Sequence, residues 1–356
     1  MPAKRMSDAM LRRALDAVEK HGSISVAARA LKLPKTTFES RVRAAHERLG
    51  DAEASRQADK PFEAEPLPSE LPSADDLLKR RREQFARKRT AKDARHLIGV
   101  TVTTPGPVGL AFMGDPHVDD DGTDIALLEE HVALFQKHDA LLPVGIGDYS
   151  NNWVGRLARL YGQQSLSAAE AWVLVEWLVH AVTWLALVSG NHDAWSGDGD
   201  PIKWMAKAAR VQYEAHGARL GLTFPNGRVI RVNARHDFTG RSMWNTAHGP
   251  AKAAQLGWRD HILIAGHTHV SGIQVVRDPM SGLISHALRI GSYKTIDRYA
   301  DEKGLPNQQF TVCPVVVVRP QFADDDNRLL TTIFEPGTAA DFLAFLRRRK
   351  SEPGVS

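Results

Sequence analysis

The chain of 356 residues contains a single cysteine, Cys313, and has no long apolar run. One cysteine excludes an internal disulfide and a zinc site built from several cysteines. The most apolar stretch, residues 171–188, is interrupted by Glu176 and His180, so we do not expect it to span a membrane. The first residues are charged and lack the apolar core of a signal peptide, which predicts a cytoplasmic protein.

Basic charge is concentrated near the N-terminus. Residues 1–50 contain 11 Lys/Arg against 5 Asp/Glu, residues 51–78 contain 2 against 8, and residues 79–95 contain 9 against 2. Residues 96–356 contain 24 Lys/Arg against 27 Asp/Glu, so the net charge of this part is slightly negative. This alternation predicts separate units, of which the basic ones suit an acidic partner such as nucleic acid.

Residues 1–50 have the pattern of a small helical domain. Apolar positions spaced three and four apart predict a helix over 8–20, Gly22 ends it, and shorter helices are expected over 26–31 and 35–49. The segment Ser23–Val42 resembles the helix-turn-helix of bacterial and phage DNA-binding proteins, which implies that the third helix enters a major groove. The residues expected to face DNA are Lys35, Thr36, Thr37, Arg41 and Arg43. A three-helix bundle for dimerisation or partner docking is the alternative interpretation.

Two segments follow this domain. Residues 51–72 are acidic, contain four prolines and show almost no apolar periodicity, which predicts a linker. Residues 73–97 are expected to form a basic helix capped by Ser73. Its basic side chains are Lys79, Arg80, Arg81, Arg82, Arg87, Lys88 and Arg89. Such a run either follows phosphates or is simply solvated, and the helix-turn-helix pattern upstream favours nucleic-acid contact.

From residue 98 to residue 350 the pattern alternates between buried strands and amphipathic helices. Strands are predicted over residues 108–113, 141–146, 181–188, 229–234, 261–265, 272–276, 284–290 and 312–318. Helices are predicted over residues 123–138, 165–180 and 201–216. The alternation predicts an α/β domain of mixed β-sheets flanked by helices, with polar groups collected at one strand end.

Five short polar motifs end predicted strands in this domain. They are Asp115-Pro116-His117, Gly147-Asp148, Gly190-Asn191-His192-Asp193, His236 and Gly266-His267-Thr268-His269. Each alone is common in surface loops, but the ordered set of five is specific. Over about residues 105–320 the chain resembles the calcineurin-like metallophosphoesterase superfamily, which implies that fold and a hydrolase that acts on phosphoric esters.

The chemistry of the motifs agrees with this resemblance. Carboxylate, amide and imidazole groups without sulfur suit Mn²⁺, Fe or Zn²⁺. The resemblance implies two divalent metal ions, with Mn²⁺ favoured and Fe or Zn²⁺ as alternatives, bridged by Asp148 and by a hydroxide that attacks phosphorus. It assigns the other ligands to the two ions, namely Asp115, His117 and His269 to the first, and Asn191, His236 and His267 to the second.

Two residues of the third motif are expected to act beside the metals. The resemblance makes His192 the candidate for protonating the leaving oxygen or binding the phosphoryl group. Asp193 is expected to orient His192, or alternatively to cap the turn that follows it. Arg159 and Lys294, which follow other strands, are candidates for substrate contact, as is Tyr293.

Departures from the family's best-known branches narrow the substrate. The residues after Asp148 lack the arginine with which Ser/Thr phosphatases clamp a monoester, and Asn151 replaces the tyrosine ligand of purple acid phosphatases. A phosphodiesterase is therefore favoured, and the basic N-terminal region favours a nuclease that hydrolyses DNA, in an arrangement like that of phage or prophage proteins. The alternatives are a phosphoesterase for a small nucleotide or phosphoprotein with a regulatory N-terminal domain, and a DNA-binding adaptor with a vestigial metal site.

Overall fold

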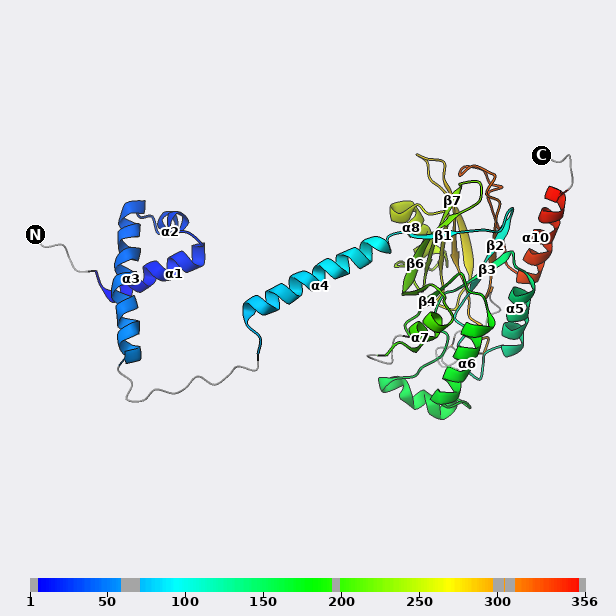
Figure 1. Ribbon diagram of the computed structural model, residues 1–356, viewed down its shortest axis with the longest axis horizontal. Helices are drawn as coiled ribbons and strands as arrows, with labels where there is room; N and C mark the ends of the chain where they lie inside the picture. Colours follow the sequence, from blue (N-terminus) through cyan, green and yellow to red (C-terminus); the bar gives the residue numbers. More distant parts are fainter. Residues whose placement is uncertain (1–5, 59–70, 194–198, 297–303, 305–310, 352–356) are drawn as a thin grey trace, which may run out of the picture. The chain divides into compact units, whose positions relative to one another are not determined.

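The computed structural model describes residues 6–58, 71–193, 199–296, 304 and 311–351 (Figure 1). The chain divides into two compact units, Met1–Arg81 and Arg82–Ser356. No helix in the described part of the chain is both long enough and apolar enough to cross a membrane.

The N-terminal unit contains three packed helices. They are α1 (Asp8–His21), α2 (Ile24–Ala30) and α3 (Lys35–Ala58). The side chains of Ser7 and Ser23 cap α1 and α2 by accepting from backbone N–H groups, and Gly22 ends α1 in the left-handed conformation. A small core between the helices includes Ala14, Ala27, Phe38 and Val42.

Helix α3 is longer than the sequence pattern predicted. It continues past residue 49 to Ala58, because no proline follows Gly50 before Pro61 and the intervening residues are helix-compatible. The first part of the segment expected to be a linker is therefore helical, and residues 59–70 of that segment lie outside the described chain. Helix α4 (Ala74–Ala94) follows, and all of its residues are exposed.

The C-terminal unit is an α/β structure with two mixed sheets of six strands each (Figure 1). One sheet has the order β12-β11-β2-β3-β4-β5. Its strands are β2 (Val108–Met113), β3 (Leu141–Gly145), β4 (Ala186–Ser189), β5 (Tyr213–Ala215), β11 (Val315–Val318) and β12 (Leu330–Ile333). The other sheet has the order β1-β6-β7-β8-β10-β9. Its strands are β1 (Ile98–Thr101), β6 (Gly217–Thr223), β7 (Val229–Arg235), β8 (Ile262–Ala265), β9 (Gly272–Arg277) and β10 (Ile284–Arg289). The predicted fold class is confirmed.

The main core lies between the two sheets. Leu110 and Val188 of one sheet pack in the same buried cluster as Val232 and Ile264 of the other. A second core lies beneath helices on the outer face of the β2 sheet, and Figure 1 shows α5 and α10 on that side and α8 on the opposite side. The helices of this unit are α5 (Ile125–Lys137), α6 (Ala168–Ala181), α7 (Pro201–Ala208), α8 (His248–Ala253) and α10 (Pro336–Ser351). Two irregular helices accompany them, η1 (Gly155–Gln163) and η2 (Ala254–Trp258).

Two predicted elements are wrong in part. The helix expected over 201–216 ends at Ala208, because Arg210 adopts a positive φ of 58° and residues 213–215 leave to form β5 beside β4. The strand expected over 181–188 begins only at Ala186, since α6 continues to Ala181.

Candidate metal centre

Five strand ends bring the predicted site residues together. Strands β2, β3 and β4 are parallel neighbours in one sheet, and β7 and β8 are parallel neighbours in the other. Polar groups that follow parallel strands emerge at the same edge of a sheet. The two edges meet, since His236 after β7 lies against Asp148 after β3.

Asp148 lies between two groups of histidines. Its Oδ2 atom is 4.0 Å from Nε2 of His117, 3.9 Å from Nε2 of His192 and 3.2 Å from Nε2 of His236. Two possible metal-holding triads result, His117–Asp148–His192 and Asp148–His236–His267. A carboxylate shared in this way is consistent with two metal ions about 3.5–4 Å apart.

The remaining candidate ligands extend the two groups. Nε2 of His117 is 3.3 Å from Nε2 of His269, which is 3.6 Å from Oδ2 of Asp115. On the other side, Nε2 of His236 is 2.9 Å from Oδ1 of Asn191 and 3.1 Å from Nδ1 of His267. The structure therefore brings all seven predicted ligands close together, with His192 beside His117 and Asp148 as well.

The donor set fits divalent cations. Ring nitrogens and side-chain oxygens face one another at these distances, so their lone pairs repel unless a proton or a cation lies between them. In addition, Oδ1 of Asp115 and Nδ1 of His117 are buried without a hydrogen-bond partner among the described residues. Buried polar atoms without partners are uncommon in proteins, and a bound ion is one accepted reason for them. The absence of sulfur suits Mn²⁺, Fe or Zn²⁺, and Cys313 is buried in the helix-covered core.

The protonation of the centre is uneven. Burial lowers the pKa of His236, but the carboxylates of Asp148 and Asp115 raise it by more, so that its pKa is about 10. Despite its own burial, Asp148 has a lowered pKa because of His236. Burial, together with His192 and His269, holds the pKa of His117 well below its usual value. Without metal, His236 therefore carries a proton, whereas His117 presents neutral nitrogens.

The backbone at the candidate ligands is strained. Positive φ angles occur at Asp115 (28°), His117 (38°), Asp148 (55°), His267 (71°) and His269 (51°). Such conformations cost on the order of 1–3 kcal/mol each for residues other than glycine, and they cluster at functional sites. The strain points to a backbone arranged for the positions of these side chains rather than for stability.

Asp193 supports the centre through backbone contacts. Its carboxylate accepts hydrogen bonds from the N–H groups of Gly190 (2.7 Å), Asp148 (2.8 Å) and Tyr149 (3.0 Å). Burial and the nearby Asp148 raise the pKa of Asp193 to about 7. These contacts tie the loop after β4 to the loop that carries Asp148. Nδ1 of His192 lies 2.6 Å from the carbonyl oxygen of Asn151. This carbonyl therefore orients His192, which is the role that we expected of Asp193.

Sequence reasoning missed a polar network beside the centre. The backbone N–H of Asn151 donates to Asp119 (2.7 Å), and its side-chain amide donates to Asp120 (2.9 Å). Nζ of Lys294 lies 3.0 Å from Oδ2 of Asp120. The available signal was the run of three aspartates at 119–121, one residue after the first motif. Such a run is typical of a solvated loop, although Asp119 is buried.

The expected substrate contact of Tyr293 is wrong. Its side chain is fully buried, and its hydroxyl lies 2.6 Å from Nδ1 of His131 on α5. Tyr293 therefore stabilises the packing of α5 and cannot reach a ligand.

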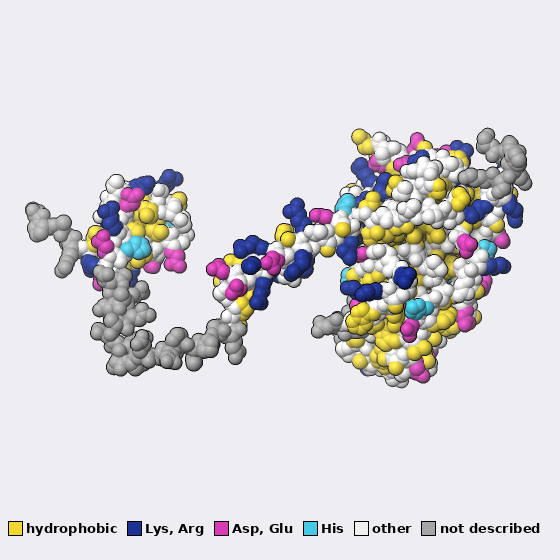
Figure 2. All heavy atoms as spheres, in the orientation of Figure 1, with side chains coloured by type: hydrophobic (Ala, Val, Ile, Leu, Met, Phe, Trp, Pro, Cys, Tyr) yellow, Lys and Arg dark blue, Asp and Glu magenta, His cyan; other side chains and the backbone are white. Residues whose placement is uncertain are grey.

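The residues predicted to contact DNA lie on surfaces of the chain. On α3, Lys35, Thr36, Thr37 and Arg43 are exposed and Arg41 is half-buried. The seven predicted basic residues of α4 are all exposed, and Figure 2 shows Lys and Arg side chains along this helix. Their accessibility permits contact with a partner and does not identify one.

Comparisons with known proteins gave structural matches only. Neither a scan against protein-family models nor a search of curated proteins found a match. Among solved structures, the chain is similar to the calcineurin-like phosphoesterase YfkN from Bacillus subtilis, with a TM-score of 0.33 and 12% identity, covering 68% of this chain and 99% of that one. It is also similar to the Pseudomonas putida nuclease MPE, with a TM-score of 0.31 and 14% identity, covering 63% of this chain and 87% of that one.

Proposed function

We propose that the chain is a phosphodiesterase of the calcineurin-like type that depends on two divalent metal ions and hydrolyses DNA. The observation that carries the proposal is the position of Asp148, whose Oδ2 lies 3.9–4.0 Å from His117 and His192 and 3.2 Å from His236. Asp115 and His269 extend one side of this arrangement, and Asn191 and His267 extend the other.

The residues of the centre divide the chemical work. Divalent ions bound there would supply Lewis acidity and an activated water at neutral pH. Asp193 holds the loops of Asp148 and Asn191 in place through three backbone hydrogen bonds. His192 donates its Nδ1–H to the carbonyl of Asn151, which leaves Nε2 directed toward the centre. A proton on Nε2 is then placed for transfer to the leaving oxygen.

The sequence around Asp148 supports a diester rather than a monoester. Tyr149, Ser150 and Asn151 follow the bridging carboxylate, and no arginine stands among them to clamp a dianionic phosphate. A diester carries a single negative charge, which makes fewer demands on cationic side chains. A phosphoesterase for a small nucleotide or phosphoprotein would instead hydrolyse a phosphomonoester faster than a phosphodiester.

The N-terminal half of the proposal rests on charge and exposure. Lys35, Thr36 and Thr37 are exposed at the start of α3, as are the corresponding residues of the recognition helix in a helix-turn-helix. Helix α4 adds a run of exposed basic residues that suits contact with DNA phosphates. Both features support DNA as the substrate that reaches the centre.

The experiment is a substrate panel with metal-free protein and added Mn²⁺. We expect hydrolysis of bis(p-nitrophenyl) phosphate and of single-stranded, duplex or nicked DNA, and we expect Asp148→Asn to abolish it. Asp341→Asn, an exposed aspartate on α10, is the matched control and should retain activity. Turnover of the small diester without cleavage of any DNA would show that DNA is not the substrate. Faster hydrolysis of a monoester than of a diester would show that the protein is a monoesterase, and full activity of Asp148→Asn would refute the metal centre.

A further inference from the structure

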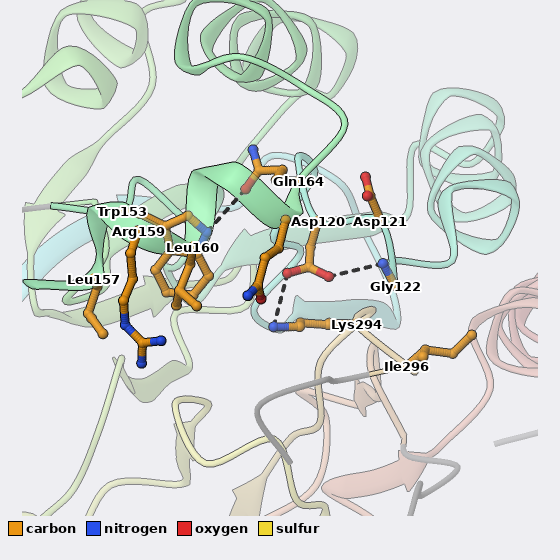
Figure 3. A pocket seen from close by; sticks show the side chains of 11 residues that line it. Asp120, Asp121, Gly122, Trp153, Leu157, Arg159, Leu160, Gln164, Lys294 and Ile296 are labelled. Atoms are coloured by element: carbon orange, nitrogen blue, oxygen red, sulfur yellow. Dashed lines mark hydrogen bonds and ion pairs between the residues drawn. The ribbon is translucent and has the colours of Figure 1, made fainter. Parts of the chain in front are cut away.

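A cavity of about 240 Å³ lies beside the candidate metal centre (Figure 3). Three segments that are distant in sequence build its walls. The loop after β2 contributes Asp120–Gly122, the segment after β10 contributes Lys294 and Ile296, and η1 with the residues flanking it contributes the rest. None of the seven predicted metal ligands lines it.

The cavity and the candidate metal centre share a wall. The ring of Trp153, which lines the cavity, meets the ring of His192 edge to face, with 5.3 Å between their centroids. Asp120, on another wall, accepts a hydrogen bond from Asn151, whose carbonyl meets His192. The cavity and the candidate metal centre are therefore neighbours, with Trp153 and His192 between them.

One side of the cavity is formed by the ring of Trp153, and Nζ of Lys294 lies over this ring at 5.8 Å from its centroid. Nε1 of Trp153 donates to Oε1 of Gln164 at 3.1 Å, and Nε2 of Gln164 donates to Asp119 at 3.1 Å. The indole is therefore held by a hydrogen-bonded chain, which reduces the entropy lost when a ligand stacks on it. Leu157 and Leu160 of η1 line the cavity beside it, as Figure 3 shows.

The charged side chains that line the cavity balance in number, Arg159 and Lys294 against Asp120 and Asp121, which suits a neutral ring better than a second phosphate. The ammonium of Lys294 lies 3.0 Å from the carboxylate of Asp120, so its charge is compensated locally. Asp121 adds a second carboxylate, which accepts hydrogen bonds from the backbone N–H and the hydroxyl of Ser165. The volume is below the roughly 300–1,000 Å³ of pockets for drug-sized ligands, which limits the occupant to a single small ring system.

We propose that this cavity receives a base of the DNA strand next to the scissile phosphate, stacked against Trp153 and Leu160. The proposal rests on the proposed function, because it assigns part of the substrate of the same site. It makes Trp153, Leu160 and Gln164 determinants of specificity: esters that carry a nucleobase are preferred over simple alkyl esters of the same phosphate.

The first test measures binding without catalysis. Saturation-transfer NMR with metal-free protein and thymidine should show transfer to the base protons. Trp153→Ala and Leu160→Trp, which remove the stacking surface and fill the cavity, should each abolish it. Trp204→Ala, which removes an exposed tryptophan on α7, should not. Absence of transfer with the unmodified protein, or transfer unchanged in both cavity variants, would overturn the proposal.

The second test measures the preference for an ester that carries a nucleobase over a methyl ester. With Mn²⁺ present, kcat/KM is compared for thymidine 5′-(p-nitrophenyl phosphate) and methyl p-nitrophenyl phosphate, which share a leaving group. Trp153→Ala should reduce the ratio of the two by about tenfold or more, the usual effect of losing one base–aromatic stack. An unchanged ratio would overturn the assignment. If the unmodified protein binds thymidine but hydrolyses neither ester, the proposed function fails while the cavity assignment stands.

Discussion

The protonation of His236 is expected to make metal binding at the candidate centre depend on pH. Its pKa of about 10 reflects two carboxylates that hold a proton in the position where a cation would otherwise neutralise them. A metal ligand must be unprotonated, so metal binding has to displace this proton.

We therefore expect the affinity for Mn²⁺ to rise with pH. Below the pKa of about 10, each pH unit should strengthen binding by about tenfold for the one proton that is released. Calorimetric titration at several pH values, in buffers of different ionisation enthalpy, measures both the affinity and the number of protons. Affinity that is independent of pH between about 6.5 and 8.5 would contradict the protonation of His236.

A substitution of His192 can distinguish a role in proton transfer from a role in metal binding. Its side chain is more exposed than those of His117 and Asp148, and its Nδ1–H is committed to Asn151. We expect His192→Ala to retain Mn²⁺ and to lose about 10²–10⁴ in kcat, the usual contribution of a general acid. Metal content by mass spectrometry and turnover of a small diester provide the two readouts. Loss of a bound ion together with activity would instead make His192 a ligand.

Backbone strain at His269 gives a prediction about stability. The residue has a φ of 51°, which glycine adopts freely and which costs other residues roughly 1–2 kcal/mol. Both His269→Gly and His269→Ala remove the same imidazole, but the glycine variant should unfold at the higher temperature. Thermal melts of the two metal-free variants under identical conditions make the comparison, and equal melting temperatures would show that the backbone there is relaxed.

At the scale of elements, the ends of the ligand-bearing strands followed from the sequence, whereas several neighbours did not. The prediction for β2 agrees with Val108–Met113, because an uninterrupted apolar run stops at Gly114-Asp115. Strand β5 was missed because it has three residues and exists through pairing with β4, which no local pattern encodes. The hydrogen bonds of Asn151 with Asp119 and Asp120 were missed for the same reason: they join residues more than thirty positions apart.

Helix α4 gives a prediction about DNA. None of its residues is buried, so its basic side chains contribute little to the packing of the protein. We expect Arg80→Gln combined with Arg82→Gln to weaken DNA binding. The slope of log K against log salt should become shallower by about 0.9 for each DNA phosphate that is no longer neutralised. Arg348→Gln with Arg349→Gln, two exposed arginines on α10, is the matched control. Equal salt slopes for the two double variants would make α4 a solvated helix.

At the scale of the whole molecule, hydrolysis and DNA affinity are expected to reside in different parts of the chain. The candidate centre is built entirely from residues of the unit Arg82–Ser356. Removal of residues 1–70 should therefore leave kcat/KM for bis(p-nitrophenyl) phosphate unchanged while DNA affinity falls. Fluorescence anisotropy with labelled duplex, beside a colorimetric assay, measures both. Undiminished DNA affinity in the shortened protein would refute the role assigned to α1–α3.

The helix η1 lies between Val154 and Gln164, whereas every candidate metal ligand follows the end of a strand. In our proposal, the side chains that select the substrate, Trp153, Leu160 and Gln164, are distinct from the candidate metal ligands. None of the nine residues of η1 is a candidate metal ligand. Libraries that vary η1 together with Trp153 and Gln164, while keeping the candidate ligands, are accordingly the economical way to test which esters the protein accepts.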